Sequence, residues 1–217
     1  TTLDDDTLTL TVYLTDAAAN QGSDAQDTIV KDVVAPNAPT AAVIVAGAGW
    51  STDYITNANK TATKASGNKS SDTTSIKIDI DDEDTFANAK TRTLSSLGSG
   101  TTYADATGID VTTATALVDG TIAIRITAFD AAGNTATQEV LKAAGTFNKD
   151  TVAPSGYSVN IDQAYINDAN KAAMSFTFTS AEVGATYNYS VDDTNGGTSP
   201  VTGSDTITSA SQQVSGI

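Results

Sequence analysis

The stretch Thr121–Asn134, TIAIRITAFDAAGN, decides the fold of this chain, and it has a close relative at Thr7–Asn20, TLTLTVYLTDAAAN. In both stretches apolar and polar residues alternate, and the pattern Asp-Ala-Ala-x-Asn closes the alternating part. Alternation with a period of two is typical of a β-strand that buries one face. The buried face is predicted to hold Ile122, Ile124, Ile126 and Ala128 in one copy and Leu8, Leu10, Val12 and Leu14 in the other.

Two further matches extend the repeat over most of the chain. KDVVAP at Lys31–Pro36 recurs as KDTVAP at Lys149–Pro154, and YITNANK at Tyr54–Lys60 recurs as YINDANK at Tyr165–Lys171. The offsets of 111, 114 and 118 residues between matching segments indicate small loop insertions in tandem domains. Because proline favours an extended chain at and before its own position, we predict that the KD-x-VAP segments are interdomain linkers.

These matches predict a division of the chain into three parts. Residues 1–31 are expected to be the C-terminal part of one repeat, residues 32–149 a complete repeat, and residues 150–217 the N-terminal part of a further repeat. We expect the whole to be one two-domain period of a longer array.

Shorter alternating segments predict the remaining strands. They place Ile76, Ile78 and Ile80 on one face, Met174, Phe176 and Phe178 on another, and Tyr187, Tyr189 and Val191 on a third. No segment has a helical period, and Asp-Gly, Asn-Gly-Gly and Ser-Gly turns separate the strands. The fold is therefore predicted to be all-β, with tandem immunoglobulin-like antiparallel β-sandwich domains.

One difference between the copies concerns the size of core residues. Where the later copy has Phe176 and Phe178, the complete repeat has Ala65 and Gly67, and Trp50 is a candidate to fill the resulting space. The two tyrosines of the later copy alternate with polar residues, so they are predicted to be core aromatics and not a sugar-stacking platform.

Composition limits the partners and the chemistry. A net charge of −15 and a pI near 4.1 argue against nucleic acid and anionic membrane surfaces, and they favour cations as counterparts. The chain has no Cys and no His, which excludes disulfides and catalysis by a thiolate or an imidazole. No apolar run approaches the roughly 20 residues needed to cross a bilayer, and no paired carboxylates with an orienting base suggest a hydrolase. We expect a protein that is not an enzyme and does not insert into a membrane.

Three of these features together resemble the immunoglobulin-like repeats of giant cell-surface adhesins of bacteria. They are the DGT segment with its alternating strand at Asp119–Ala128, the DAAGN loop at Asp130–Asn134, and the KD-x-VAP linker. The resemblance implies an extracellular protein of the bacterial cell surface, secreted for adhesion and biofilm formation. In that family such repeats act as spacers stiffened by calcium at the domain junctions. The implied partners are neighbouring repeats of the same long chain and other copies in a surface assembly.

Acidic residues concentrate in one run of the complete repeat. DIDDED at Asp79–Asp84 aligns with a later segment that retains Asp192, Asp193 and Asn195 at the positions of Asp81, Asp82 and Asp84. Neighbouring carboxylates repel one another, and a hard divalent cation removes that repulsion. Ca²⁺ takes six to eight oxygen ligands, in which this chain is rich. Calcium is therefore the predicted cofactor.

The expected topology indicates which acidic segments could meet. Strand C, the loop between strands E and F, and the exit of strand G share one pole of an immunoglobulin-type sandwich, whereas the loop between F and G lies beside the incoming linker. The predicted calcium ligands at the first junction are Asp32, Asp130 and Asn134, with the counterparts of Asp192, Asp193 and Asn195. At the second junction they are Asp81, Asp82, Asp84, Asp119 and Asp150, with Asp16 and Asn20 standing in for the loop of the next domain.

Other interpretations of the same segments remain open. An acidic run is often a solvated loop, and the Asn of DAAGN can serve only to supply a left-handed backbone conformation. The DIDDED run lacks the spacing of an EF-hand loop. Alternative functions are an S-layer, sheath or filament building block assembled through lateral contacts, and a module that binds glycans.

Overall fold

The computed structural model describes residues 2–45, 53–113, 115–194, 196–197 and 199–217. The chain forms two compact units, residues 1–151 and residues 152–217. The predicted all-β class is confirmed, since the described segments form sixteen strands and a single short 3₁₀ helix, Lys142–Ala144. No helix in these segments is long and apolar enough to span a membrane. The separation of residues 1–31 from residues 32–149 as parts of different repeats stays a prediction.

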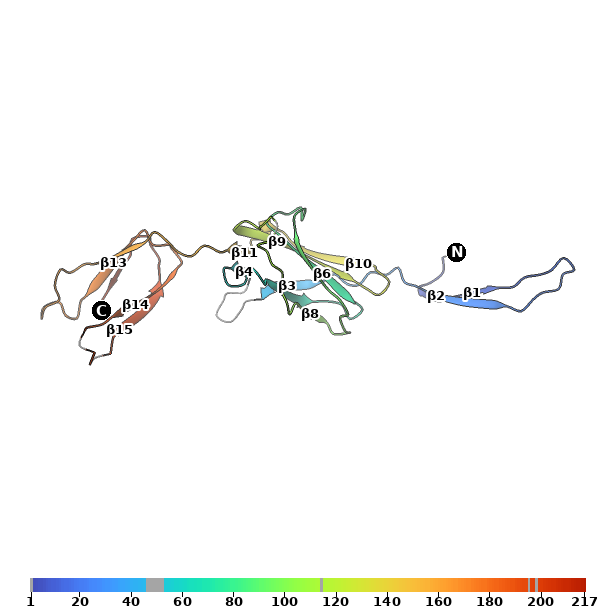
Figure 1. Cartoon of the computed structure of the whole chain (residues 1–217), viewed down its shortest axis with the longest axis horizontal. Coiled ribbons are helices and arrows are strands. Elements are labelled where there is room, and N and C mark those ends of the chain that lie inside the picture. The colour runs from blue at the N-terminus through green and yellow to red at the C-terminus, as the bar shows by residue number, and fades with distance from the viewer. Residues whose placement is uncertain (1, 46–52, 114, 195, 198) are drawn as a thin grey trace. The chain divides into compact units, whose positions relative to one another are not determined.

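Two sheets face each other in the part of the first unit that follows the first linker (Figure 1). One sheet has the order β3 (Thr40–Val45), β5 (Lys64–Asn68) and β8 (Thr102–Ala104). The other has the order β4 (Tyr54–Thr56), β11 (Phe147–Asp150), β9 (Gly120–Phe129), β6 (Ser75–Asp81) and β7 (Lys90–Leu94), and β10 (Thr135–Val140) also pairs with β9. Strand pairs are antiparallel except β11 and β4, where Asn148 lies opposite Tyr54 in a parallel ladder.

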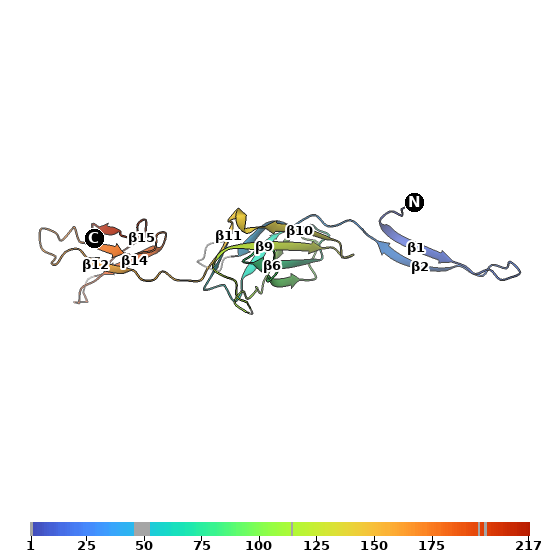
Figure 2. The same ribbon diagram turned by 90° about the horizontal axis from the view of Figure 1, so that it is seen from above.

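The predicted alternation fills the space between these sheets. Figure 2 shows β6, β9 and β10 side by side in the larger sheet. The apolar faces of β6 and β9 are at most 1% exposed, as the sequence predicted for Ile76, Ile78, Ile80, Ile122, Ile124, Ile126 and Ala128. The smaller sheet contributes Ile44, Ala65 and Tyr103 to the same core. The long alternating strand therefore lies at the centre of the sandwich.

The space above Gly67 is occupied by a tyrosine of the neighbouring strand. Gly67 pairs with Tyr103, and a Cβ atom at Gly67 would lie 2.7 Å from the Tyr103 hydroxyl oxygen. Trp50, the residue proposed from sequence to fill this space, lies outside the described residues. In the second unit the aligned residue is Phe178, which is buried and donates its backbone N–H to the carbonyl oxygen of Gln212 at 2.8 Å. The aligned positions therefore hold a glycine beneath the Tyr103 ring in the first unit and a buried phenylalanine in the second.

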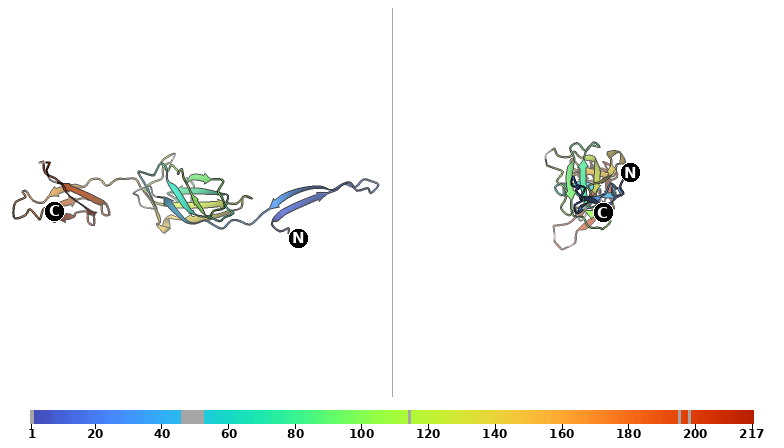
Figure 3. Two further views of the ribbon diagram at one scale, coloured as in Figure 1. Left: turned by 90° about the horizontal axis from the view of Figure 1, so that it is seen from below. Right: turned by 90° about the vertical axis from the view of Figure 1, so that its right-hand side faces the viewer.

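Residues 6–31 form a two-stranded hairpin of β1 (Asp6–Val12) and β2 (Ala25–Lys31) (Figure 3). Its register copies that of β9 and β11, because Leu8 lies opposite Ile29 as Ile122 lies opposite Phe147. The side chains on the predicted inner face of the hairpin are not buried, however: Leu10 is 63% exposed and Leu14 is 81% exposed.

An insertion explains why the repeat offset changes along the chain. In the hairpin, Asp27 pairs with Leu10 and Ile29 pairs with Leu8 along one continuous strand. In the complete repeat the corresponding partners on the two strands are Val140 and Phe147. The additional residues, 141–145, contain the 3₁₀ helix. They lie between β10 and β11 in the chain and do not pair with β9.

The second unit contains two small sheets. One has the order β12 (Ser158–Ile161), β13 (Ser175–Thr179) and β16 (Gln213–Ser215), and the other pairs β14 (Thr186–Val191) with β15 (Val201–Thr206). Phe176, Phe178 and Ile207 belong to its buried core. Tyr187 and Tyr189 pack against that core, which confirms their prediction as core aromatics.

Gly108 provides a test of the packing at the edge of the sandwich. Its φ is +95°, and a Cβ atom there would lie 2.5 Å from the carbonyl carbon and oxygen of Ala62. Gly108→Ala is therefore expected to reduce the free energy of unfolding of this domain by about 2 to 4 kcal/mol in denaturant titrations.

Gly98→Ala is the matched control for this substitution, because nothing lies within 4 Å of a Cβ atom at Gly98. We expect it to change stability by less than about 0.5 kcal/mol. Equal effects of the two substitutions would contradict the packing described for Gly108.

Candidate functional site

Each KD-x-VAP segment contains a lysine that forms an ion pair with an aspartate. That aspartate directly precedes an earlier strand, β1 or β9. At the second linker the Lys149 ammonium group contacts Oδ1 of Asp119, and Lys149 is only 7% exposed. Oδ2 of Asp119 accepts a hydrogen bond from the Thr151 N–H group at 2.9 Å. Burial opposes ionisation of Asp119, but the hydrogen bonds from Lys149 and Thr151 outweigh it, and the pKa of Asp119 is lowered. We call this arrangement the lysine–aspartate clip.

The same clip exists at the first linker. The Lys31 ammonium group contacts Oδ1 of Asp5, and Oδ2 of Asp5 accepts a hydrogen bond from the Val33 N–H group at 3.0 Å. The hydrogen bond from Lys31 is the largest cause of the lowered pKa of Asp5, followed by that from Val33. The clip is therefore a repeated property of the motif, and it fixes the backbone where the chain leaves β2 and where it leaves β11.

The domain that follows the first linker also forms hydrogen bonds with it. The side-chain amide of Asn134 donates hydrogen bonds to the carbonyl oxygens of Asp32 at 3.2 Å and Val34 at 3.3 Å. Oδ1 of Asp32 accepts the N–H group of Val34 at 3.0 Å. Asn134 and Asp32, which the sequence grouped at this junction, thus lie in contact. The backbone of residues 32–34 is hydrogen-bonded to groups on both sides of the linker.

The Asp-Ala-Ala-x-Asn loops are closed by their own first and last residues. In the complete repeat, Asp130 accepts hydrogen bonds from the Asn134 backbone N–H at 2.9 Å and from its side-chain amide at 2.8 Å. In the hairpin, Asp16 accepts the same two hydrogen bonds from Asn20, both at 2.9 Å. The first role of these four residues is therefore to close the loop.

The left-handed position of these loops is not the asparagine. The residues with positive φ are Gly133, at +92°, and Ala19, at +67°. Asn134 and Asn20 instead act through their side chains, so the simple conformational interpretation of the motif is wrong. This role leaves the oxygen of the Asn134 side chain as a further acceptor at the junction.

The acidic run contains one aspartate with an unusual environment. Asp81 ends β6 and is fully buried, and its Oδ2 accepts the Asn88 N–H group at 3.2 Å. Its Oδ1 is buried without a hydrogen-bond donor among the described residues. Burial and, next, the neighbouring carboxyl group of Asp82 raise the pKa of Asp81 above its ordinary value. A buried carboxylate oxygen without a donor is an expected ligand for a cation.

The next carboxylates of the run are held by groups of the protein. Oδ2 of Asp82 accepts the Val118 N–H group at 2.6 Å, and Oδ1 of Asp84 accepts the Lys142 N–H group at 2.7 Å. The Lys142 ammonium group also donates to the carbonyl oxygen of Asp82. Lys142 belongs to the insertion, so that segment lies against the acidic run and brings a positive charge to it.

The other predicted ligands are more dispersed. Asp150 ends β11 and lies opposite Thr56. Asp192, the counterpart of the buried Asp81, is exposed and accepts the Asp193 N–H group at 2.9 Å. Asn195 lies outside the described residues. In the complete repeat β9 pairs along the edge of β6 and covers Asp81, which lies opposite Ala123.

Calcium coordination needs several oxygen atoms around one point. Within the described ranges, no three Asp or Glu side chains converge closely enough to hold a metal ion. Asp119 and Asp5 are matched by lysines, whereas Oδ1 of Asp81 is buried without a hydrogen-bond donor among the described residues. Further ligands there would be carbonyl oxygens, waters or groups of another repeat.

The lysines are the functional residues that sequence reasoning missed. Lys31 and Lys149 are repeated in the hexapeptide as faithfully as the aspartates that follow them. That repetition was a usable signal. Lys142 carried no such signal, because it lies in a segment that has no counterpart in the hairpin.

No family model and no curated protein matches this chain. It is similar to a solved tetra-tandem repeat from the extending region of a large adhesion protein, with 20% identity and a TM-score of 0.40 over 99% of this chain and 49% of that one. It is also similar to a structure from a 1.5-MDa bacterial ice-binding adhesin that concerns retention on the host cell surface, with 19% identity and a TM-score of 0.36. That match covers 98% of this chain and 63% of the other. The chain thus spans less than two thirds of both structures, and likeness at this level does not establish a family.

The clip predicts a coupling between Lys149 and Asp119. We expect Lys149→Met to lower the free energy of unfolding by about 2 kcal/mol, because it leaves Asp119 without its ammonium partner. In a Lys149→Met/Asp119→Asn double mutant the losses should be less than additive. Denaturant titrations of the four chains measure this coupling.

Lys171→Met is the matched control for the clip. Lys171 pairs with Asp168, but the two side chains are 67% and 96% exposed. An exposed pair of this kind contributes less than about 0.5 kcal/mol. Additive effects at Lys149 and Asp119, or an effect of Lys149→Met no larger than that of Lys171→Met, would contradict a stabilising clip.

Proposed function

We propose that this chain is a spacer segment of a secreted bacterial surface adhesin, without enzymatic activity, whose immunoglobulin-like repeats are stiffened by calcium at their junctions. The observation that carries the proposal is the construction of the first linker. Its backbone is bound by Asp5 on the side of the preceding hairpin and by Asn134 on the side of the following domain.

A linker whose backbone is hydrogen-bonded to the parts on both sides transmits force and orientation between them, whereas a flexible linker does not. Flexible linkers behave as random coils because their backbones are solvated. In residues 32–34, one N–H group and two carbonyl oxygens are instead bound by side chains of the flanking parts, Asp5 and Asn134. The recurrence of the clip at Lys149 supports the same role for the second linker. A repeated, anchored linker is what a spacer requires.

Calcium is proposed at the acidic pole of the complete repeat. Asp81 and Asp82 are the first ligands in this proposal, and Asp84, Asp119 and Asp150 are candidates beside them. When bound there, Ca²⁺ would supply positive charge to a buried carboxylate that lacks a donor. The raised pKa of Asp81 supports this assignment, since it reflects an ionised form that is poorly stabilised by the protein alone.

In this proposal calcium stabilises the junction together with the lysines and not alone. Lys142 and Lys149 already neutralise part of the acidic pole. We therefore propose that the linkers retain their backbone contacts without the ion, and that calcium restricts the remaining motion. Extracellular calcium modules bind at about 10⁻⁴ to 10⁻³ M, so such a site fills outside the cell and stays empty in the cytosol.

Calcium should raise the unfolding temperature of the chain and increase its maximum dimension in small-angle scattering relative to chelator. At a free concentration ten times the dissociation constant, the added stability is about 1.4 kcal/mol. Asp81→Asn should abolish this gain. Asp168→Asn is the control, because Asp168 is an exposed loop residue whose ion pair with Lys171 lies far from burial: its side chain is 96% exposed.

Two results would refute the calcium part of the proposal. One is an unfolding temperature and a maximum dimension that are the same with calcium and with chelator. The other is an equal calcium response in Asp81→Asn and the unmodified chain.

A further inference from the structure

The complete repeat is an open sandwich, so each of its two sheets ends in edge strands. Among the described strand pairs, β3 and β8 are the edges of the smaller sheet. In the larger sheet β7 forms one edge, and β10 and β4 form the other. An edge strand can pair with a strand of another chain unless its sequence or its geometry opposes that pairing. The five edge strands differ in this respect.

Three of the edge strands have features that oppose pairing. β7 carries two positive charges, Lys90 and Arg92, and β8 is only three residues long. The register of β3 with β5 is irregular between Thr40 and Val43, and Ala41 has a φ of +52°. Positive charge, short length and a bulge are common means by which natural sheets protect their edges.

The fourth edge strand, β4, is bound by a side chain of the YITNANK segment. The side-chain amide of Asn59 donates a hydrogen bond to the carbonyl oxygen of Tyr54 at 2.9 Å, and its oxygen accepts the Thr56 N–H group at 2.6 Å. The preceding carbonyl oxygen, of Asp53, is bound by β11, so the groups that Asn59 binds point away from β11. Asn170 closes the matching loop of the second unit in the same way. This recurring asparagine therefore protects the outer edge of β4.

The fifth edge strand, β10, has none of these features. Its six residues, Thr135–Val140, pair with β9 in an unbroken register. They include no lysine, arginine, proline or glycine, and the one charged residue is Glu139. β4 does not cover β10, because it pairs with Asn148–Asp150 further along the chain. Every second residue of an antiparallel edge strand points its N–H and C=O groups away from its partner, so β10 offers these groups to a further strand.

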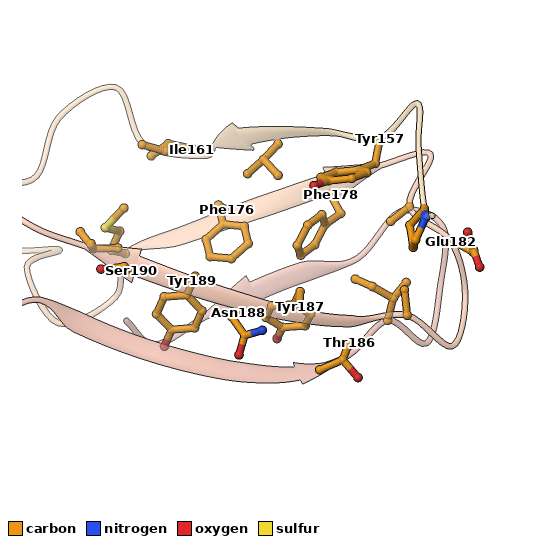
Figure 4. A pocket seen from close by; sticks show the side chains of 17 residues that line it. Tyr157, Ile161, Phe176, Phe178, Glu182, Thr186, Tyr187, Asn188, Tyr189 and Ser190 are labelled. Atoms are coloured by element: carbon orange, nitrogen blue, oxygen red, sulfur yellow. The ribbon is translucent and has the colours of Figure 1, made fainter. Parts of the chain in front are cut away.

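The hollow between the two sheets of the second unit is a less suitable surface for a partner. It has a volume of about 620 Å³, and aromatic side chains from both sheets line it (Figure 4). Phe176 and Phe178 in this hollow are only 6% and 7% exposed, and their ring centroids lie 5.4 Å apart. These rings already pack within their own core.

We propose that β10 of the complete repeat pairs with β10 of a second copy of this chain, antiparallel and about a two-fold axis at Thr137. Residues directly opposite each other in such a pair lie on the same face of the sheet. Thr137 then lies opposite its own copy, and Glu139 lies opposite Thr135 of the second copy. The Thr137 hydroxyl also donates to the Thr127 hydroxyl of β9 at 3.3 Å. The contact would therefore be crossed by a row of four threonines.

The charges along β10 favour a second copy as the partner. Glu139 lies opposite Arg125 of β9, with 4.0 Å between its Oε1 and the Arg125 Nη1. In the proposed register it meets an uncharged threonine on its other side. No like charges are then directly opposite each other, and pairs of threonines are favourable neighbours across strands. The edge is thus complementary to itself.

The contact is isologous, so it joins copies in pairs. It consists mainly of main-chain hydrogen bonds between two short strands, and we expect a dissociation constant of about 10⁻⁴ to 10⁻³ M. Where many repeats lie side by side, several weak contacts of this kind act together. The contact lies within the complete repeat, and it depends neither on calcium nor on the proposed adhesin function.

Sedimentation equilibrium of the 217-residue chain tests the association. We choose chelator and about 0.5 M salt, which screens the charge of −15 on each copy. The weight-average mass should rise towards that of a dimer as the concentration approaches about 1 mM. Thr137→Lys should weaken the association by about fivefold or more, because two ammonium groups would lie opposite each other.

Thr93→Lys is the matched control for this substitution. Thr93 is also an exposed threonine, and it lies on β7 at the other edge of the same sheet. The two variants have the same net charge. We expect the Thr93→Lys chain to associate like the unmodified chain.

Disulfide formation tests the register, because the chain has no cysteine of its own. Thr137→Cys should form a disulfide-linked dimer under mild oxidation, since opposite residues of antiparallel strands have Cα atoms about 4.5 to 5.5 Å apart. Thr93→Cys is the control, and it should stay largely monomeric.

Three results would each overturn the proposal. The first is a chain that remains monomeric at about 1 mM. The second is a Thr137→Lys chain that associates as strongly as the unmodified chain. The third is an equal yield of dimer from the two cysteine variants. Thr137 is exposed, so circular dichroism of its variants should show an unchanged fold and the comparisons stay valid.

Discussion

The lysine–aspartate clip is the interaction on which the repeat architecture depends. A linker between sandwich domains must leave the last strand at a fixed point, because otherwise the motion of one domain is uncoupled from that of the next. Asp119 fixes that point with a carboxylate that binds Lys149 and the Thr151 N–H group together. The side chain and the backbone of one hexapeptide thus converge on a single acid. The prolines that follow extend a chain whose direction the clip has already set.

Much of the fold follows from the sequence because its signals are local. The alternation in residues 121–128 identified the central strand and its buried face, and Ile122, Ile124 and Ile126 are buried as predicted. The parallel pairing of β4 with β11 was not predicted, since no local signal specifies which distant strand lies beside an edge. The sequence predicted an unfilled space at Gly67, and the ring of Tyr103, a non-local neighbour, fills it.

The candidate site was less predictable, because burial and charge neutralisation are tertiary properties. Asp81 and Asp192 occupy equivalent places in the sequence, yet one is buried beneath β9 and the other is exposed. Only the structure, with β9 paired beside β6, identifies Asp81 as the aspartate of DIDDED that has an oxygen without a hydrogen-bond donor among the described residues. Lys142 donates hydrogen bonds to Asp82 and Asp84 of the acidic run. It lies in the insertion between β10 and β11, and in a sequence alignment this insertion is visible only as a change of offset.

The aligned positions Gly67 and Phe178 differ greatly in size, and this difference bears on the exchange of strands between the two units. Tandem domains with similar sequences can exchange equivalent strands during folding, which traps misassembled pairs. A strand carrying Phe178 placed beside Tyr103 would bring two rings into the space of one. A strand carrying Gly67 in place of Phe178 would leave a cavity in the core of the second unit. Each unit therefore disfavours the strand of the other at this position, which opposes strand exchange between the two.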